Sequence, residues 1–291
     1  MDLDSLPQDQ VEEVFARHGA LAITLTDAGD RPVLEPAPGE TPLWPDTRIT
    51  GLFSSDVDIE LLQDDLLQSF DIDTLPSHEM TDLEDRDWQC EWREDLGPLK
   101  FGARLWICPD DTTADNDDAV IVRLDPGLAF GTGTHATTAL CLEWLDSLAL
   151  QGSRVLDYGC GSGVLAIAAL LLGCETACAF DIDPQAIAAT RNNASRNSVA
   201  DRLSVSGSSE DVAGVFDVVV ANILAGPIIR LAEPITHHVK SGCLLALSGI
   251  LSEQVDAVLD AYKPWIEFEE PAFRIQDGQT WARLTGARNK G

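Results

Sequence analysis

The chain lacks any long hydrophobic run, and its longest uninterrupted apolar stretch is Val164–Leu172. Because a membrane-spanning helix requires about 20 apolar residues, we expect no transmembrane segment. No apolar stretch precedes Arg17, which is the first basic residue, so we also expect no secretory signal peptide.

The cysteines and histidines form no framework or metal-ligand pattern. There are seven cysteines, an odd number, and only Cys174 and Cys178 lie close together. This usage indicates reduced thiols, and we expect a cytoplasmic protein. The neighbouring His237 and His238 point in different directions on a predicted helix, and no G-x-S-x-G motif occurs. We therefore expect neither a metal site nor a serine hydrolase.

Basic residues are scarce: 19 Lys and Arg stand against 49 Asp and Glu, which gives a net charge of −30. Such a surface repels phosphate backbones, so direct nucleic-acid binding is disfavoured. Two interpretations of the acidity remain open. It provides a docking face for a basic protein, or it keeps the whole surface solvated in a high-salt cytoplasm, where charge repulsion is screened.

The length of 291 residues, with 45% hydrophobic residues, indicates two folded domains. The acidic excess is greatest in residues 1–100, which marks the first unit. Its periodicity predicts a small α/β unit with helices at Val11–Arg17 and Ile59–Ser69 and strands at Ala20–Thr26, Arg48–Phe53 and His78–Leu83.

From residue 120 short β-branched runs alternate with longer helical ones, which predicts an α/β fold with a doubly wound, mostly parallel sheet. The expected strands are Arg154–Tyr158, Thr176–Ile182, Leu203–Ser206, Phe216–Ala221 and Cys243–Ser248. The expected helices are Gly163–Gly173, Pro184–Asn197, Pro227–Val239 and Ser252–Tyr262. At the end, Glu267–Ile275 and Thr280–Thr285 flank Asp277-Gly278, which predicts an antiparallel final hairpin.

The strongest local motif runs from Val155 to Gly163, where a buried strand enters a glycine-rich loop and then an apolar helix. Glycines let a ligand approach the backbone, and the helix N-terminus favours an anionic group. The glycines fall at Gly159, Gly161 and Gly163, after an Asp. A dinucleotide fingerprint would place its third glycine at Val164, so this D-x-G-x-G-x-G pattern resembles class I methyltransferases instead.

Polar residues stand at the ends of two later predicted strands. Asp181 ends a predicted strand, where its carboxylate can accept hydrogen bonds from both ribose hydroxyls, and Asp183 is assigned to capping the following helix. Asn222 ends the strand beginning at Phe216. It lacks the Pro-Pro-aromatic cluster that grips planar targets, which favours a flexible aliphatic amine as the methyl acceptor.

Together with a second glycine-rich stretch, Asp125–Thr138, these motifs resemble the ribosomal protein L-eleven (L11) methyltransferase family, PrmA, and Phe130–Thr138 beside Val219–Leu224 is a highly specific combination. The resemblance covers nearly the whole chain, including Glu35–Trp44, Asp87–Trp92 and Arg104–Pro109. It implies an S-adenosyl-L-methionine-dependent enzyme that methylates lysine side-chain and N-terminal amines of the large-subunit ribosomal protein L-eleven, a basic partner.

The resemblance also implies a domain plan and a set of site residues. Residues 1–84 would form a substrate-recognition domain, 85–110 a connecting helix and linker, and 111–291 the methyltransferase domain with its seven-stranded sheet. The implied cofactor contacts are Thr138, Gly159, Gly161, Gly163, Asp181, Asn222 and Phe130. The residues implied to act near the transferred methyl group are Asn222, His135 and Thr134, with His135 one candidate for a general base.

Two positions depart from the family pattern. Ala136 stands where proline is usual after the histidine, which we expect to loosen the loop. The family's first domain is ferredoxin-like, with an interior first strand, but only Met1–Pro7 precedes the first helix here. This segment is too short and polar to fill an interior strand of about five residues, so we expect a first strand that is missing or a sheet rebuilt with three strands.

Two rival functions are weighed against methyl transfer. A nicotinamide-dependent oxidoreductase is disfavoured by the position of the third glycine. A noncatalytic acidic assembly factor that binds a ribosomal protein would have no need to retain every expected cofactor position.

Overall fold

The computed structural model describes residues 1–3, 6–29, 44, 46–82, 97–108, 118–124 and 135–290. The chain divides into two compact units, Met1–Arg86 and Asp87–Gly291, and each is described by itself. Much of the predicted connector 85–110 lies outside the described residues, but its end forms strands β3 (Leu99–Phe101) and β4 (Leu105–Cys108). The division into residues 1–84, 85–110 and 111–291 remains a prediction.

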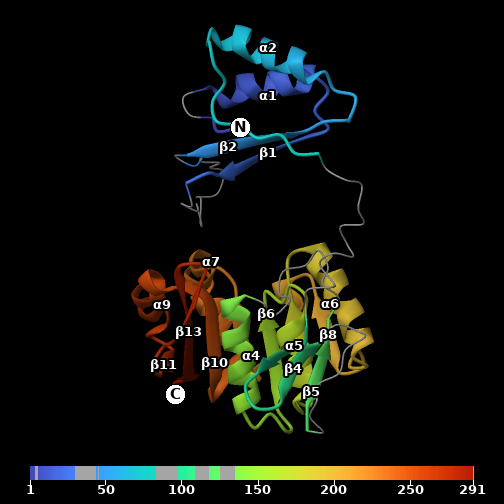
Figure 1. The fold of residues 1–291 in the computed structure, drawn as a ribbon. Helices are drawn as coiled ribbons and strands as arrows, with labels where there is room; N and C mark the ends of the chain where they lie inside the picture. The colour runs from blue at the N-terminus through green and yellow to red at the C-terminus, as the bar shows by residue number, and fades with distance from the viewer. Residues whose placement is uncertain are drawn as a thin grey trace. The chain divides into compact units, whose positions relative to one another are not determined.

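The first unit packs two helices on one face of an antiparallel hairpin (Figure 1). Its elements are α1 (Gln8–Arg17), β1 (Ala22–Asp27), β2 (Thr47–Leu52) and α2 (Ile59–Phe70). The apolar residues of both helices recur at helical spacing, which puts them on the helix faces that meet the sheet. Together with residues outside the helices they form a core of Leu3, Val11, Val14, Phe15, Ile49, Leu62 and Leu66.

The first three residues occupy an interior position of this small sheet. Asp2 forms an isolated antiparallel bridge with Arg48, and the N–H of Leu3 donates to the carbonyl of Thr47. On the other side, the N–H of Asp2 donates to the carbonyl of Ser77. The segment forms no full strand, as expected. Backbone hydrogen bonds nevertheless hold residues 1–3 on both sides.

The second unit is built on a mixed sheet in which the strand order is β11-β13-β10-β9-β6-β7-β8, with β12 also paired to β13. The strands are β6 (Arg154–Tyr158), β7 (Thr176–Phe180), β8 (Leu203–Ser206), β9 (Phe216–Asn222), β10 (Val239–Leu251), β11 (Ile266–Phe268), β12 (Ala272–Gln276) and β13 (Gln279–Arg288). β6 to β10 pair in parallel, and β13 is antiparallel to its neighbours. This confirms the predicted doubly wound, mostly parallel fold with an antiparallel end.

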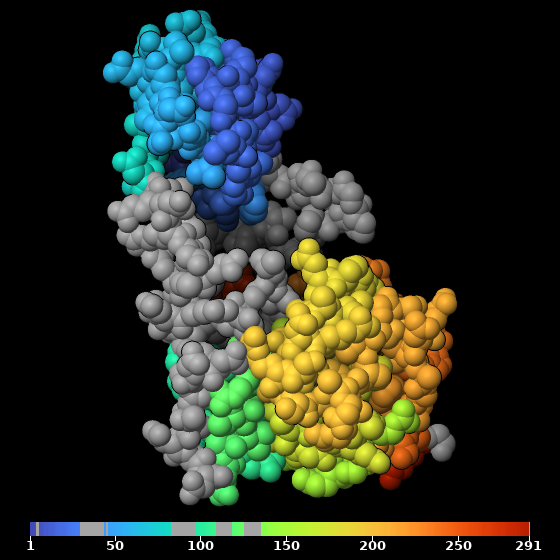
Figure 2. All heavy atoms as spheres, turned by 90° about the vertical axis from the view of Figure 1, so that its right-hand side faces the viewer, coloured from blue at the N-terminus to red at the C-terminus, as the bar shows by residue number. Residues whose placement is uncertain are grey.

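Two apolar layers cover the faces of this sheet. One cluster joins α4 (Ala136–Ser147), α5 (Val164–Leu171) and the small sheet of β3, β4 and β5 (Val120–Arg123). The other joins α7 (Ala225–Arg230), α8 (Ala232–His238) and α9 (Val255–Tyr262). α6 (Pro184–Arg196) lies beside β8, on the side of the unit that faces the viewer in Figure 2.

Two predicted elements are divided in the structure. The predicted strand Glu267–Ile275 forms β11 and β12, separated at Pro271, whose missing N–H interrupts a ladder. Within the described part of the chain the sheet therefore has eight strands rather than the predicted seven. The predicted helix Pro227–Val239 forms α7 and α8, because Pro234 cannot donate to the carbonyl one turn earlier.

Two sequence-based expectations also bear on the described residues as a whole. No helix among them is long and apolar enough to cross a membrane. Cys141, Cys160, Cys174, Cys178 and Cys243 are free thiols, in agreement with the prediction of reduced cysteines.

Candidate functional site

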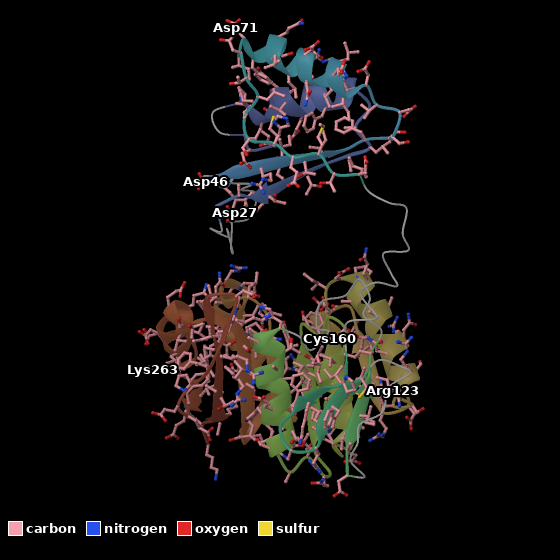
Figure 3. The ribbon with its side chains drawn as sticks, in the orientation of Figure 1. Asp27, Asp46, Asp71, Arg123, Cys160 and Lys263 are labelled. Carbon is pink, nitrogen blue, oxygen red and sulfur yellow. The ribbon has the colours of Figure 1, made fainter. Side chains whose placement is uncertain are left out.

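The glycine-rich loop after β6 requires its glycines. The φ angles of Gly159, Gly161 and Gly163 are 80°, 53° and 78°, a region that residues with a side chain rarely adopt. A Cβ atom at Gly159 would lie 2.3 Å from Cγ2 of Ile223, which follows β9. The loop therefore packs directly against the end of the neighbouring strand. Figure 3 labels Cys160 within it, at the upper end of the sheet.

Helix α6 fixes the loop from the other side. Thr190 Oγ1 donates to the carbonyl of Gly161 over 2.9 Å, and Asn193 Nδ2 donates to the carbonyl of Ser162 over 2.9 Å. Both side chains are buried. Because these bonds satisfy the loop carbonyls, the loop keeps one backbone shape that leads into the N-terminus of α5, where the partial positive charge favours an anionic group.

Asp181 lies beside this loop at the end of β7, as the sequence predicted. Its Oδ2 accepts from the N–H of Gly161 at 2.9 Å, and its Oδ1 accepts from the N–H of Asp183 at 3.0 Å. Each carboxylate oxygen has a second acceptor site, so the group can still bind hydroxyls. Asp183 accepts from the N–H of Gln185 and caps α6, which confirms its assigned capping role.

Sequence reasoning missed the residue between these two acids. The side chain of Ile182 is 82% exposed, although it follows a buried strand. A large apolar side chain presented to solvent beside a candidate ribose-binding carboxylate offers a surface for a planar ring. The signal in the sequence was an isoleucine enclosed by two aspartates at a strand end.

Asp157, inside β6, is the most strongly perturbed carboxyl group of the site. It is fully buried; its Oδ2 accepts from the N–H of Ala166 at 3.1 Å, and its Oδ1 has no partner among the described residues. Burial raises the pKa of Asp157 to about 7, with a smaller opposing effect from the Ala166 hydrogen bond.

Asn222 and Thr138 are brought together, as expected of two cofactor contacts. Asn222 Nδ2 donates to Thr138 Oγ1 over 3.2 Å, which connects the end of β9 to the first turn of α4. Asn222 Oδ1 is buried without a partner among the described residues. The neighbouring Ser248 of β10 donates to the carbonyl of Thr137, so the same turn is also held from β10. No sequence motif indicated that Ser248 belongs to the site.

His135 caps α4, one turn before Thr138. Its Nδ1 lies 2.8 Å from Thr137 Oγ1, and its ring packs edge-on against Trp281 with the ring centroids 4.8 Å apart. Partial burial lowers the pKa of His135, against the opposing charge of Asp277. The imidazole is therefore neutral at neutral pH. Phe130 and Thr134, the other predicted residues of this region, lie outside the described residues.

Ala136 makes a hydrogen bond at the start of α4. Its N–H donates to Oε1 of Gln276 at the end of β12, a bond that a proline at this position could not make. The loop that precedes His135 lies outside the described residues, so the effect on that loop stays a prediction.

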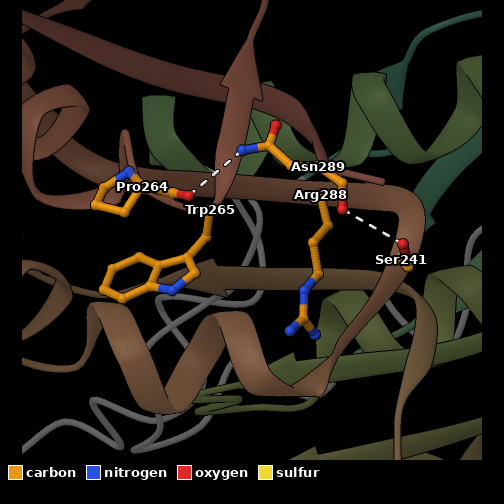
Figure 4. A pocket seen from close by; sticks show the side chains of 5 residues that line it. All are labelled: Ser241, Pro264, Trp265, Arg288 and Asn289. Atoms are coloured by element: carbon orange, nitrogen blue, oxygen red, sulfur yellow. Dashed lines mark hydrogen bonds between the residues drawn. The ribbon is translucent and has the colours of Figure 1, made fainter. Parts of the chain in front are cut away.

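A surface hollow at the opposite end of the sheet is separate from this site. Figure 4 shows its lining residues, Ser241, Pro264, Trp265, Arg288 and Asn289. They come from the start of β10, the end of β13 and the turn after α9, whereas the site residues follow the carboxyl ends of β6, β7 and β9. The candidate site thus lies at those carboxyl ends, which is where open α/β sheets bind ligands.

Comparison with known proteins identifies a family that matches almost the whole chain. The model of the family described as ribosomal protein L11 methyltransferase (PrmA) matches residues 2–289. A ribosomal protein L11 methyltransferase from Alteromonas mediterranea is 48% identical over 280 residues, which cover 96% of this chain and 94% of that protein. The same protein from Pasteurella multocida is 47% identical, over 96% of this chain and 94% of that protein.

A solved structure supports the same relationship. The crystal structure of ribosomal protein L11 methylase from Lactobacillus delbrueckii subsp. bulgaricus superposes with a TM-score of 0.59 at 30% sequence identity. The match covers 67% of this chain and 98% of that one.

Proposed function

The chain belongs to the ribosomal protein L11 methyltransferase family, and we propose that it transfers methyl groups from S-adenosylmethionine to lysine side-chain and N-terminal amines of ribosomal protein L11. The observation that carries the proposal is the loop of three left-handed glycines, which lies against Asp181 on one side and Ile223 on the other. Because the chain belongs to a methyltransferase family, the alternative of a nicotinamide-dependent oxidoreductase has no support.

The residues of the crevice fit this cofactor. A Cβ at Gly159 or Gly163 would collide with Ile223 or Thr190, so glycine is needed for this loop shape, and two buried oxygens, Asp157 Oδ1 and Asn222 Oδ1, face no donor among the described residues. S-adenosylmethionine carries an ammonium group and two ribose hydroxyls that need acceptors, and a carboxylate that suits a helix N-terminus. The proposed contacts are Thr138, Gly159, Gly161, Gly163, Asp181, Asn222 and Phe130.

When bound, S-adenosylmethionine supplies a methyl group activated by its sulfonium. The protein's own contribution is to position an acceptor amine and to keep it neutral, because a protonated amine has no lone pair. A free lysine has a pKa of about 10.4, and a dry, cation-bearing crevice lowers that value. We assign the orientation of the amine to Asn222, whose free Oδ1 can accept its N–H.

His135 has the protonation state that a proton acceptor needs. Its pKa is lowered by burial, so the neutral imidazole predominates at neutral pH. It also caps α4 and packs on Trp281, so its ring has a defined orientation. Thr134 is proposed to act in the same region.

Charge supports a basic protein as the acceptor. The net charge of −30 attracts a basic ribosomal protein and repels nucleic acid. We propose that residues 1–84 form the substrate-recognition domain.

The test is incubation of the protein with purified L11 and methyl-labelled S-adenosylmethionine, followed by mass analysis of intact L11 and its peptides. We expect label on lysine and N-terminal amines of L11. Label found only in RNA, or in no protein, overturns the proposal, and the second result favours the noncatalytic assembly factor.

A matched pair of glycine variants connects activity to the loop. Gly159→Ala places a Cβ 2.3 Å from Ile223, whereas Gly152→Ala has the same left-handed φ requirement, 71°, with nothing within 4 Å. Both variants bear the cost of the φ angle, roughly 1 kcal/mol. Only Gly159→Ala is expected to lose methylation and cofactor binding, and equal activity of the two would contradict the assigned loop.

A further inference from the structure

β12 is an edge strand that leads directly to the candidate site. Among the described residues it pairs only with β13, and β10 occupies the other side of β13. At its end, Gln276 bonds the N–H of Ala136 at the start of α4. The charge of Asp277, in the turn that follows, acts on His135. The unpaired edge of β12 therefore ends beside the residues proposed to handle the amine.

The hydrogen-bond pattern shows which backbone groups face outward. Asp277 and Gly278 have φ angles of 50° and 74°, as in a two-residue hairpin turn, and Gln276 lies opposite Gln279. The residues that flank such a turn exchange both hydrogen bonds, and alternate residues do not. Counting back from Gln276, the N–H and C=O groups of Ile275 and Phe273 point away from β13.

The side chains of the same two residues are also presented to solvent. Phe273 is 52% exposed and Ile275 is 75% exposed. The alternate residues hold the strand on α4: Arg274 Nη2 bonds Glu143 Oε1 over 2.7 Å, and Gln276 bonds Ala136. β12 is thus fixed by one face and offers apolar side chains on the other.

Proteins normally protect such an edge against pairing with another chain, by an edge lysine, a bulge or a proline within the strand. β12 has none of these: its five residues are Ala-Phe-Arg-Ile-Gln, and Pro271 precedes them. Its only charged side chain, Arg274, is turned to Glu143. An unprotected apolar edge next to a functional site is the arrangement that strand-adding peptide sites use.

Acidic residues identify the partner. Glu269 and Glu270 precede the strand and Asp277 follows it, and all three are exposed. We propose that the free edge of β12 binds an extended, basic segment of the protein substrate as an added strand and so directs its acceptor amine toward His135 and Asn222. This inference rests on the proposed function. Backbone pairing with Phe273 and Ile275 would supply affinity without demanding one sequence, and the acidic residues would select basic segments.

Amide hydrogen exchange tests the pairing itself. The full chain is compared with and without L11, both with saturating S-adenosylhomocysteine. We expect exchange at the amides of Phe273 and Ile275 to slow at least roughly tenfold with L11, because those amides become hydrogen-bonded. The amide of Arg274, already bonded to β13, should change little. Unchanged exchange at Phe273 and Ile275 overturns the inference, as does protection without L11 that grows with protein concentration, which would mean pairing between two copies.

A charge variant tests the consequence for catalysis. Ile275→Lys places a cation on the edge, and we expect the KM for L11 to rise roughly tenfold while kcat and the affinity for S-adenosylmethionine stay unchanged. Val215→Lys, at a 42% exposed residue just before β9, is the matched control and should leave the KM unchanged. Ile275→Thr keeps the strand preference but removes apolar surface, so it should raise the KM less, in the same direction.

The outcomes separate this inference from the proposed function. If the wild-type protein methylates L11 and Ile275→Lys does so with the same KM, the edge is not a substrate site and the proposed function stands. If the wild-type protein does not methylate L11, the proposed function is wrong, and the exchange experiment alone decides whether L11 pairs with β12.

Discussion

At the scale of single residues, Asp157 is the group whose protonation most affects stability. Its carboxyl group is buried with one oxygen unpartnered, and its pKa is raised to about 7. An acid whose pKa is raised on folding favours the folded state when protonated. That contribution is complete below the unfolded pKa of about 3.9 and is lost as the pH rises through about 7.

We therefore predict that Asp157→Asn, which mimics the protonated acid, removes this loss. Between pH 4.5 and pH 8 the free energy of unfolding of the wild type should fall relative to the variant, by about 3 kcal/mol. Urea unfolding of both proteins across this range is the measurement. Asp211→Asn, at an exposed residue, is the control and should follow the wild type. Parallel curves for the wild type and Asp157→Asn would show that Asp157 is ionised throughout.

A variant at Asn222 distinguishes positioning of the acceptor amine from binding of the cofactor. Because its Oδ1 is free and its Nδ2 is held by Thr138, we predict that Asn222→Ala slows single-turnover methylation by about 100-fold, the order that a misplaced reactant costs. Cofactor affinity, which rests also on the glycine loop, should weaken less. Rapid-quench assays and calorimetry on the folded variant measure both quantities. An unchanged rate would remove Asn222 from the mechanism.

The two aspartates after β7 form a matched pair. Asp181→Ala should weaken cofactor binding by about 1–3 kcal/mol, because it leaves hydroxyls without an acceptor and frees the N–H of Gly161. Asp183→Ala removes only the cap of α6, which should cost about 1 kcal/mol of stability at unchanged affinity. Calorimetric titration and thermal unfolding of both variants decide the matter. Equal affinities would mean that Asp181 only holds the glycine-rich loop and does not bind the ribose.

At the scale of secondary-structure elements, alternating periodicity was enough to predict the main sheet and its final hairpin. The failures have local causes. A strand pattern that spans Pro271 became two strands, and the small sheet of β3, β4 and β5 was not predicted. The interior residues Met1–Leu3 were missed because three residues carry no periodicity; their place is set by tertiary hydrogen bonds.

Some residues of the candidate site could be predicted from the sequence, and others could not. Gly159, Asp181 and Asn222 could be proposed from sequence because each directly follows a recognisable strand. Trp281 and Gln276 could not, since they lie about 140 residues beyond His135 and Ala136 in the chain and meet them only through the fold. Residues that position a site from another element leave no local pattern.

Gly249 is such a positioning residue, and it belongs to an irregularity of β10. The register between β10 and β13 shifts between Ser248 and Ile250, and Gly249 adopts a φ of 86° there. A Cβ at Gly249 would lie 2.1 Å from the backbone oxygen of Ile223. The bulge thus lets β10 approach the chain that follows Asn222.

We predict that Gly249→Ala moves the end of β9 and weakens both stability and cofactor binding. The strained φ and the backbone overlap should together cost about 2–4 kcal/mol of unfolding free energy. Gly19→Ala has a similar φ, 80°, with nothing within 4 Å, and should cost only about 1 kcal/mol. Urea unfolding and calorimetric titration with S-adenosylhomocysteine compare the two. A Gly249→Ala protein that binds like the wild type would exclude the positioning role.

At the scale of the whole molecule, charge repulsion opposes folding. The acidic residues outnumber the basic ones by 30, and several of the described cations are already paired, including Lys240 with Asp217 and Arg274 with Glu143. The remaining carboxylates repel one another across a surface that folding brings together. Salt shortens the range of this repulsion from about 30 Å at 0.01 M to about 3 Å at 1 M.

We therefore predict that the protein is less stable at low ionic strength. Thermal unfolding from 0.01 M to 1 M KCl should show a midpoint that rises by at least about 2 °C, the shift expected for roughly 1 kcal/mol in a chain of this size. Chloride is used because sulfate would strengthen apolar burial by itself. If screening is the cause, most of the rise comes at low concentration, where the screening length changes most. A midpoint that does not depend on salt, together with L11 binding that weakens steeply in salt, would contradict the prediction and assign the acidity to docking the basic substrate.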